Sequence, residues 1–535
     1  MTRLALLLSL LASVPALADY QGLPADGNRF GFVGYGARWI DTVRWRYNVA
    51  NEPASLTRDQ ILTALQRAMA KWEAGCNIKF EYLGETNAPL MTQDGISTIG
   101  WSTDFGFDGY ALFWWNAQRQ INEGDIQFNY RGLTTVESLE ANATHEIGHI
   151  IGLSHSDQPA AVMFSYPYHP YAYQNVLKGD DLAACARHYG GRGLQNVTDY
   201  SSLPVQPRAG LSTTFEIGTT VPAATPTGSS LSTIPADQSG TVYFAVHYNG
   251  LAAAQSLTLR LVSPDGTLYY SYPFSAETGN RYVYLSWTWP NTGMARLPGN
   301  WKLQLVDGDH VLAQHSFSVA TGYATPQLPE VALLGQFQSG TWRFSHQMLT
   351  HGATLRNQRW TLDNANAGTD ATLSNQLSSG KHSVQLWTVS TNPRYNGGIP
   401  SSSGQDADGP DGGHTLDFTL TDDGKPTARA FRSDVSGFKA AATVRSEIHI
   451  PETGTQQVYV AALLGNMLFF KSSQGWGLQQ EPLLTVTGPA MISMPLLDRL
   501  DTRLLPAGTV VLGGYGSDIA SLIRNGQFGE LYKVQ

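Results

Sequence analysis

One run of residues constrains this chain more than any other: His145-Glu146-Ile147-Gly148-His149-Ile150-Ile151-Gly152-Leu153-Ser154-His155. On a helix, His145 and His149 lie on one face, about 6 Å apart along the axis. Gly152 permits a backbone turn that a side chain would oppose, and His155 can then return toward the first two rings. Three neutral imidazoles leave one coordination position open, which is the pattern of a catalytic zinc site.

Glu146 follows the first histidine directly, where its carboxylate can take a proton from a water molecule at the metal. The shorter HExxH pattern also occurs on ordinary amphipathic helices. With the glycine and the third histidine added, a chance match falls to on the order of one in ten thousand or less. The sequence therefore predicts one zinc ion, held by His145, His149 and His155, with Glu146 as the catalytic base.

The first 18 residues have the pattern of an export signal, with Arg3, an apolar run at 4–14 and a small-residue cleavage site at Ala16 and Ala18. A membrane anchor is the alternative, but this run is too short to cross about 30 Å of hydrocarbon. We expect a secreted, extracellular protein. A net charge of −9 with 34 Lys and Arg residues argues against a nucleic-acid partner.

Hydrophobic periodicity predicts two kinds of structure after the signal. The first is an α+β domain, with a helix from the capping box of Thr57 and Gln60 to Gly75, a second helix near 137–151 and a third from Asp180 as its N-cap. Its expected strands are 44–49, 77–82, 111–115 and 125–130. From about residue 210, short alternating runs between turn residues predict β-sandwich modules.

The expected fold class is thus multidomain, with an α+β catalytic domain that contains three helices followed by β-sandwich-type modules. The predicted boundaries are a signal peptide at 1–18, the catalytic domain at 19–193, a linker and Ig-like module at 194–323, and a β-rich region at 324–535 that could divide near 425–440.

The long histidine motif resembles that of the metzincin zinc endopeptidases. Met163, in Ala161-Val162-Met163-Phe164, stands where that family has a methionine turn under the metal. Residues 38–191 look most similar to the matrixins, the matrix-metalloproteinase-like group. The flanking stretches that carry this resemblance are 44–49, 71–72, 107–109, 111–113, 124–128 and 177–190. The resemblance implies a twisted mixed sheet, one catalytic zinc and cleavage of protein or peptide substrates.

The resemblance also implies how a substrate binds. An extended peptide would add antiparallel to an edge strand at 111–115. Tyr166, Pro167 and Tyr168 would wall the pocket beside the metal, which favours an apolar residue just after the cleaved bond.

Some family features are missing from the sequence. Trp101, Thr103 and Gln127 stand at positions that usually ligate a second, structural zinc, so we expect that zinc to be absent. The family's cysteine-based latency has no counterpart before residue 38. We expect either export without a prodomain or transient occupation of the metal by Asp26.

Calcium is a further expectation from the resemblance. Asp104, Asp108 and Asp125 could bind Ca²⁺, with a solvated loop as the alternative. The acidic segment 406–412 has carboxylates at alternate positions but lacks the bidentate Glu of an EF-hand, so we expect a mobile loop there.

The only two cysteines are Cys76 and Cys185. In an exported chain we expect them to pair, closing a loop of about a hundred residues and stabilising the fold by about 4–5 kcal/mol. Two buried thiols are the alternative.

The predicted function is a secreted zinc metalloendopeptidase, expected to be a monomer, whose β-modules bind substrate, a surface or a glycan. An adhesin or glycan-binding protein with a vestigial protease domain is the alternative. A zinc hydrolase of non-peptide bonds is disfavoured by the resemblance. Five aromatic residues could form a carbohydrate platform, although on strands such residues are more often core: Tyr269, Tyr270, Tyr272, Trp287 and Trp289.

Overall fold

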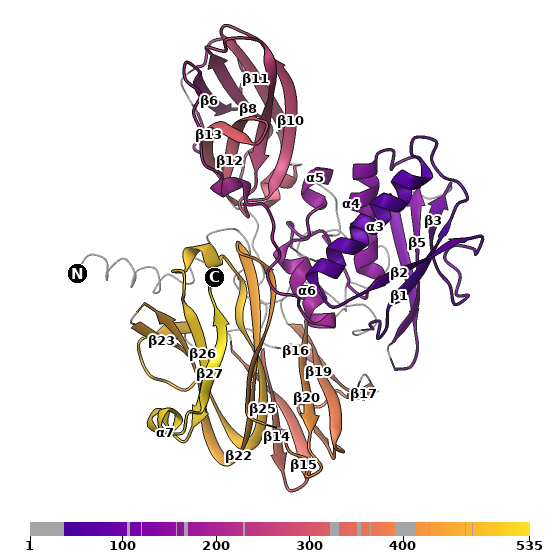
Figure 1. Ribbon diagram of the computed structural model, residues 1–535, viewed down its shortest axis with the longest axis vertical. Helices are drawn as coiled ribbons and strands as arrows, with labels where there is room; N and C mark the ends of the chain where they lie inside the picture. Colours follow the sequence, from indigo (N-terminus) through magenta and orange to yellow (C-terminus); the bar gives the residue numbers. More distant parts are fainter. Residues whose placement is uncertain are drawn as a thin grey trace.

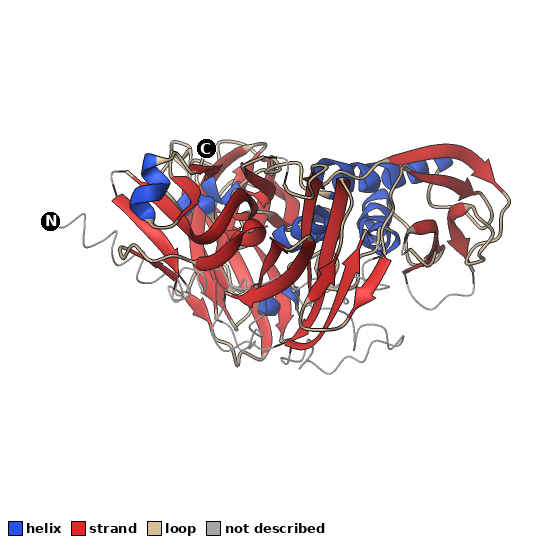
Figure 2. Cartoon of the chain, turned by 90° about the horizontal axis from the view of Figure 1, so that it is seen from below, coloured by secondary structure: helices blue, strands red, loops and turns tan. Residues whose placement is uncertain are grey.

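A computed structural model gives the arrangement of the chain (Figure 1). It describes residues 37–535 except 104–107, 119, 157, 165–168, 228–229, 291, 321–330, 350–354, 364, 391–411, 427, 466 and 473–474. The expected export signal, Asp26 and the acidic segment at 406–411 therefore lie outside the described residues. Strands dominate the molecule (Figure 2), and the longer helices lie in the N-terminal third of the chain, as the sequence colouring of Figure 1 shows.

The N-terminal third contains one five-stranded sheet in the order β2-β1-β3-β5-β4. Its strands are β1 (Val43–Asn48), β2 (Phe80–Thr86), β3 (Ser97–Ser102), β4 (Gly109–Trp115) and β5 (Ile121–Asn129). The described pairs are parallel except β4 with β5, so β4 is an antiparallel edge strand. This arrangement is the mixed sheet that the sequence predicts.

Helices accompany this sheet: α3 (Arg58–Gly75), α4 (Val136–Ile150), the short α5 (Tyr171–Gln174) and α6 (Gly179–Tyr189). The predicted start of α3 is confirmed, because the Thr57 side chain accepts from the Gln60 amide and the Gln60 side chain reciprocates. The N-cap prediction for the third helix is wrong. Helix α6 begins at Gly179 with Lys178 as its N-cap, and the Asp180 carboxylate instead accepts from Ser156 Oγ at 2.6 Å.

Two strand predictions also need correction. The strand expected at 77–82 is β2, which starts at Phe80, because Asn77 donates its amide to the Gly190 carbonyl at the end of α6. Strand β3 was not predicted. It is buried along nearly its whole length, so its sequence lacks the alternation of a half-exposed strand.

The middle of the chain contains two sheets that enclose one apolar core. One sheet has the order β10-β9-β12-β13-β7 and the other β11-β8-β6. The strands are β6 (Ser212–Gly218), β7 (Thr233–Ile234), β8 (Gly240–Asn249), β9 (Gln255–Val262), β10 (Leu268–Ala276), β11 (Arg281–Trp289), β12 (Gly299–Asp307) and β13 (His310–Val319). Of the five aromatic residues proposed as a platform, Tyr269 and Trp289 are buried in this core.

The C-terminal part contains a ten-stranded and a four-stranded sheet. Strands from both sides of residues 425–440 share the larger sheet, in which β14 and β22 both pair with β25. The elements are β14 (Val331–Gln338), β15 (Thr341–Met348), β16 (Leu355–Leu362), β17 (Ala365–Gly368), β18 (Leu373–Asn375), β19 (Gly380–Ser390), β20 (Gly412–Leu420), β21 (Ala430–Phe438), β22 (Ala441–Leu464), β23 (Met467–Ser472), β24 (Gly475–Gly477), β25 (Leu484–Leu500), β26 (Val510–Gly516), α7 (Ile519–Arg524) and β27 (Phe528–Lys533).

The N-terminal domain packs against the C-terminal part of the chain. Residues just after α6 run beside β21, where the Gly193 amide donates to the Val435 carbonyl at 2.8 Å. Phe438 and Ala441 are buried in the same apolar cluster as α3 and α4. Within the described part of the chain, no helix is both long and apolar enough to cross a bilayer.

Candidate metal centre

Helix α4 carries two of the three histidines. It starts at Thr135, whose side chain accepts from the Ser138 amide at 3.1 Å. Its apolar side, which includes Leu139, Ala143 and Ile147, is buried in the domain core. Because this side faces the core, the helix presents His145 and His149 together in a different direction.

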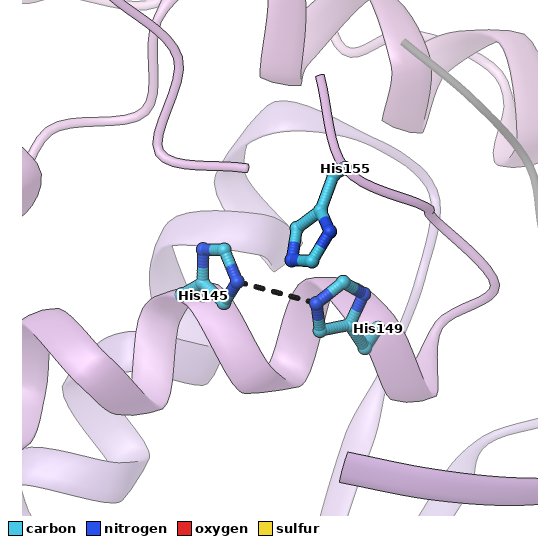
Figure 3. Close-up of side chains that lie close together, drawn as sticks. All are labelled: His145, His149 and His155. Atoms are coloured by element: carbon cyan, nitrogen blue, oxygen red, sulfur yellow. Dashed lines mark hydrogen bonds between the residues drawn. The ribbon is translucent and has the colours of Figure 1, made fainter. Parts of the chain in front are cut away.

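The structure brings all three predicted ligands together (Figure 3). The Nε2 atoms of His145 and His149 are 3.2 Å apart. One ring nitrogen from each of His145, His149 and His155 lies within 4.8 Å of the others. Among the residues that the structure describes, no other group of three His, Cys, Asp or Glu side chains meets this criterion.

Hydrogen bonds on the far side of two rings fix their orientation. His145 Nδ1 lies 2.7 Å from the Val162 carbonyl oxygen, and His149 Nδ1 lies 2.8 Å from the Leu153 carbonyl oxygen. A carbonyl only accepts, so each Nδ1 carries the hydrogen and each neutral ring turns its Nε2 lone pair inward. Two lone pairs that face each other at 3.2 Å repel unless a cation lies between them. The donor set therefore fits zinc.

The protonation of His145 agrees with this role. Burial, reinforced by His155, lowers the pKa of His145 to about 4. The ring is therefore neutral at pH 7, which is the form that binds a metal.

Two glycines allow the close approaches that the centre requires. Gly152 has φ +93°, a conformation that other residues rarely adopt, and it turns the chain from α4 toward His155. At Gly148 a Cβ atom would lie 3.0 Å from both Met163 Cε and Trp72 Cζ2. Glycine at this position lets Met163 pack directly against the helix that holds the histidines.

Glu146 lies beneath the edge strand β4. Its side chain is only 6% exposed, and burial raises its pKa to about 8. A Cβ atom on Gly109 of β4 would lie 2.7 Å from Glu146 Oε1, so the glycine makes room for the carboxylate. A cation held by the three histidines would favour the charged form of this carboxylate, which could then accept a proton and later return it.

The segment with Met163 is held by Asp181, a role that sequence reasoning missed. The Asp181 carboxylate accepts from the amides of Met163 at 3.0 Å, Val162 at 2.9 Å and Lys178 at 2.8 Å. Val162 in turn offers its carbonyl to His145. Burial raises the pKa of Asp181 to about 7, although the three amides favour its charged form. In the sequence, the only indication of this role is the pair of acidic residues, Asp180 and Asp181, at the start of α6.

The same loop is also anchored by the middle part of the chain. Lys178, 2% exposed, donates from Nζ to Thr267 Oγ1 at 2.9 Å and lies 3.9 Å from Asp265 Oδ2. Its Nζ is 3.6 Å from the centre of the Tyr173 ring. Burial lowers the pKa of Lys178 to about 8, and Asp265 opposes this shift. Sequence periodicity gave no indication of this contact.

The remaining predicted residues are placed as follows. Cys76, after α3, and Cys185, in α6, form a disulfide with a Cα–Cα distance of 5.7 Å. Asp108 is exposed, whereas Asp125 is fully buried and accepts from the Met91 and Thr98 amides at 2.7 and 2.8 Å. Asp104, Tyr166, Pro167 and Tyr168 lie outside the described residues.

Comparison with known proteins identifies the domain that holds this centre. The matrixin family profile matches residues 38–190. These residues are a matrixin-like metzincin domain. Stromelysin-3 of Mus musculus is 27% identical over 186 residues, which cover 34% of this chain and 37% of that protein.

Two further relatives are also similar to part of this chain. Stromelysin-3 of Homo sapiens is 27% identical over 224 residues, or 40% of this chain and 43% of that protein. Metalloendoproteinase 1-MMP of Arabidopsis thaliana is 29% identical over 162 residues, or 28% of this chain and 43% of that protein. This chain thus spans less than half the length of the relatives that it matches.

Proposed function

We propose that this protein is a secreted, zinc-dependent endopeptidase that cleaves protein substrates. The observation that carries this proposal is the inward convergence of the His145, His149 and His155 rings beside a buried carboxylate, Glu146, in a matrixin-like domain. A structural zinc is usually enclosed by four protein ligands, whereas three histidines leave room for a reacting molecule.

The residues divide the chemical work between them. A zinc ion held by the histidines would polarise the carbonyl of the cleaved bond and lower the pKa of a water molecule. Glu146 takes the proton of the attacking water and returns it to the leaving amine. Gly109 keeps space for the Glu146 carboxylate, and the Val162 and Leu153 carbonyls keep two rings in the required tautomer.

We infer that strand β4 receives the substrate. It is the edge of the sheet next to Glu146, so an extended peptide can extend the sheet by main-chain hydrogen bonds. Tyr110 and Trp115 of β4 are each 44% exposed and can contact substrate side chains. Tyr166, Pro167 and Tyr168 remain the predicted wall of the pocket that accepts an apolar residue after the cleaved bond.

The wider expectations complete the proposal. The protein is exported by its N-terminal signal and acts as a monomer, without a second structural zinc. Its middle and C-terminal sheets are β-sandwich-type modules that contact substrate, a surface or a glycan. Calcium at Asp104, Asp108 and Asp125 stays a prediction, although the amides bound to Asp125 already occupy part of its acceptor capacity.

A peptide-library digest tests the proposal. We expect the full chain to cleave library peptides, chelation to abolish cleavage, and one equivalent of zinc per chain to restore it. Mass spectrometry of the products would show an apolar residue enriched after the cut. Absence of cleavage in the zinc-loaded protein, together with tight glycan binding, would favour an adhesin with a vestigial protease domain.

A further inference from the structure

The sheet β11-β8-β6 presents an aromatic face away from its core. Alternate residues of β11 and β8 point outward in register, with Tyr282 opposite His247, Tyr284 opposite Ala245 and Ser286 opposite Tyr243. The intervening residues, such as Phe244 and Leu285, enter the core. We call the outward set of Tyr243, His247, Tyr282 and Tyr284 the tyrosine face.

Four rings of the tyrosine face form an unbroken row of contacts. The centroids of His247 and Tyr282 are 5.6 Å apart with planes at 21°, and those of Tyr282 and Tyr284 are 6.4 Å apart with planes at 13°. Tyr243 meets Tyr284 at 5.7 Å in an edge arrangement. Tyr282 and Tyr284 are 38% and 40% exposed, so the row is open to a ligand.

The polarity of this face limits what it can bind. Its outward neighbours on β11 are Ser286 and Thr288, both exposed, rather than aliphatic residues. Its ionisable side chains other than tyrosine, His247 and Glu216, are buried and paired with each other at 3.1 Å. The face therefore offers aromatic rings and hydroxyl groups without an unpaired charge. The neighbouring cation, Arg281 at the start of β11, is paired with Glu277 at 2.9 Å, so the described residues of this face offer no unpaired cation to an acidic ligand or an anionic membrane.

Neutral carbohydrate has the complementary chemistry. One side of a sugar ring carries C–H groups that pack against the negative face of an aromatic ring, and its edge carries hydroxyls that exchange hydrogen bonds with tyrosine, serine and threonine. A row of aromatic rings can contact consecutive sugars of one chain. The middle part of the chain lies at the end of the molecule opposite the C-terminal sheets, which leaves room for a long polymer (Figure 1).

We propose that the tyrosine face binds a neutral oligosaccharide chain. This inference deepens the proposed glycan role of the β-modules and replaces the aromatic residues first considered. Of those residues, Tyr269 and Trp289 are buried and Tyr270 and Trp287 pack against the core. Tyr272 is 41% exposed but lies on β10 in the other sheet, apart from the row that contains Tyr282 and Tyr284.

The test uses the full chain and named polysaccharides. We would measure retardation by soluble β-glucan, xylan, mannan and chitin oligomers in affinity electrophoresis. At least one should retard the wild type, and the Tyr282→Ala/Tyr284→Ala variant should lose affinity by roughly tenfold or more, the effect of truncating an aromatic anchor. Tyr282→Phe/Tyr284→Phe keeps the rings and should bind. The matched control Tyr272→Ala, which removes a tyrosine 41% exposed on β10, should bind like wild type.

Hydroxyl-radical footprinting of the wild type gives a result that does not depend on a variant folding. The bound polysaccharide should protect Tyr282 and Tyr284 but not Tyr272. The proposal is overturned if none of the polysaccharides binds, if only charged polymers bind, or if the double alanine variant binds unchanged. It is also overturned if these tyrosines are protected instead by a protein segment that pairs with the edge strand β11. Glu146→Gln should bind the polysaccharide normally, so this test and the peptidase test fail independently.

Discussion

Two regions around the histidines are held by different means. Helix α4 is held by contacts within its own domain, namely its Thr135 N-cap and its buried apolar face. Two backbone carbonyls orient its histidine rings: that of Leu153, 4 residues from His149, and that of Val162, 17 residues from His145. The two described ends of the next segment, at Met163 and at Lys178, instead depend on buried polar groups. One of these groups is the Asp181 carboxylate of α6. The others belong to Asp265 and Thr267, and Thr267 lies 89 residues beyond Lys178 in the sequence.

This difference shows that the helix that carries His145 and His149 and the segment that ends at Lys178 are positioned by separate sets of contacts. The histidine positions follow from a short stretch of helix and turn. The segment that ends at Lys178 also contacts the middle part of the chain, whose core includes Ala160 and Tyr173 of the N-terminal domain.

The largest effect is expected from the histidine helix itself. His149→Ala removes one of three ligands, so the purified protein should lose bound zinc and all measurable peptide cleavage. Metal content by mass spectrometry and cleavage of a fluorogenic peptide would measure both. His188→Gln changes a buried histidine outside the three-histidine cluster and should retain zinc. Full zinc occupancy in His149→Ala would contradict the ligand assignment.

The next effect concerns the disulfide between Cys76 and Cys185, which joins two parts of the same domain. Cys76→Ser/Cys185→Ser should lower the free energy of unfolding by about 4–5 kcal/mol, since the bond closes a long loop between α3 and α6. Urea unfolding of the wild type with and without reductant should give a similar loss. An unchanged midpoint under reductant would show that the bond contributes little to stability.

The loop side of the comparison is tested at Asp265. Asp265→Ala leaves the Lys178 ammonium buried without its acidic partner and should cost about 3–5 kcal/mol in urea unfolding. Adding Lys178→Met should recover much of this loss, because the buried ammonium that lost its partner is then removed. Zinc affinity in Asp265→Ala should change far less than in His149→Ala. If Asp265→Ala and His149→Ala lost zinc to the same extent, the two regions would not be positioned independently.

The smallest effect is expected at the junction with the C-terminal sheets. Glu447 lines a cavity of about 760 Å³ between the N-terminal domain and β22, near Arg445, Asp417, Arg432 and His449. Burial, opposed by Arg445, raises the pKa of Glu447 to about 7. The folded state therefore binds this proton more tightly than the unfolded state.

The sign of the pH effect follows from this shift. The contribution of Glu447 to stability is present below about pH 4 and is lost as the pH rises to about 7. Between about pH 4 and about pH 7, the free energy of unfolding of the wild type should fall by about 1–3 kcal/mol relative to that of Glu447→Gln, as measured by urea unfolding. The exposed control Glu481→Gln should follow the wild type. Parallel profiles for wild type and Glu447→Gln would contradict the assignment.

The sequence predicted the α4 region well because its determinants are local. An i, i+4 histidine pair and a glycine, all within eight residues, indicate from the sequence alone that His145, His149 and His155 can converge. Strand β3 escaped prediction because a fully buried strand carries no alternation. Lys178 and Asp265 escaped because their pairing depends on how two domains dock. The sequence could not show that Tyr282 and Tyr284 are exposed while Tyr269 is buried. Which face of a strand is buried depends on the sheet that packs against it, and the sequence does not reveal that sheet.

The central claim is that Glu146 performs proton transfer at a zinc held by the three histidines. Its most direct test compares Glu146→Gln with Glu137→Gln, an exposed glutamate on the same helix, in peptide cleavage and zinc content. Both variants should bind one zinc per chain. Glu146→Gln should cleave roughly 10²–10⁴-fold more slowly than wild type, whereas Glu137→Gln should cleave normally. Wild-type cleavage by a zinc-loaded Glu146→Gln protein would contradict the account.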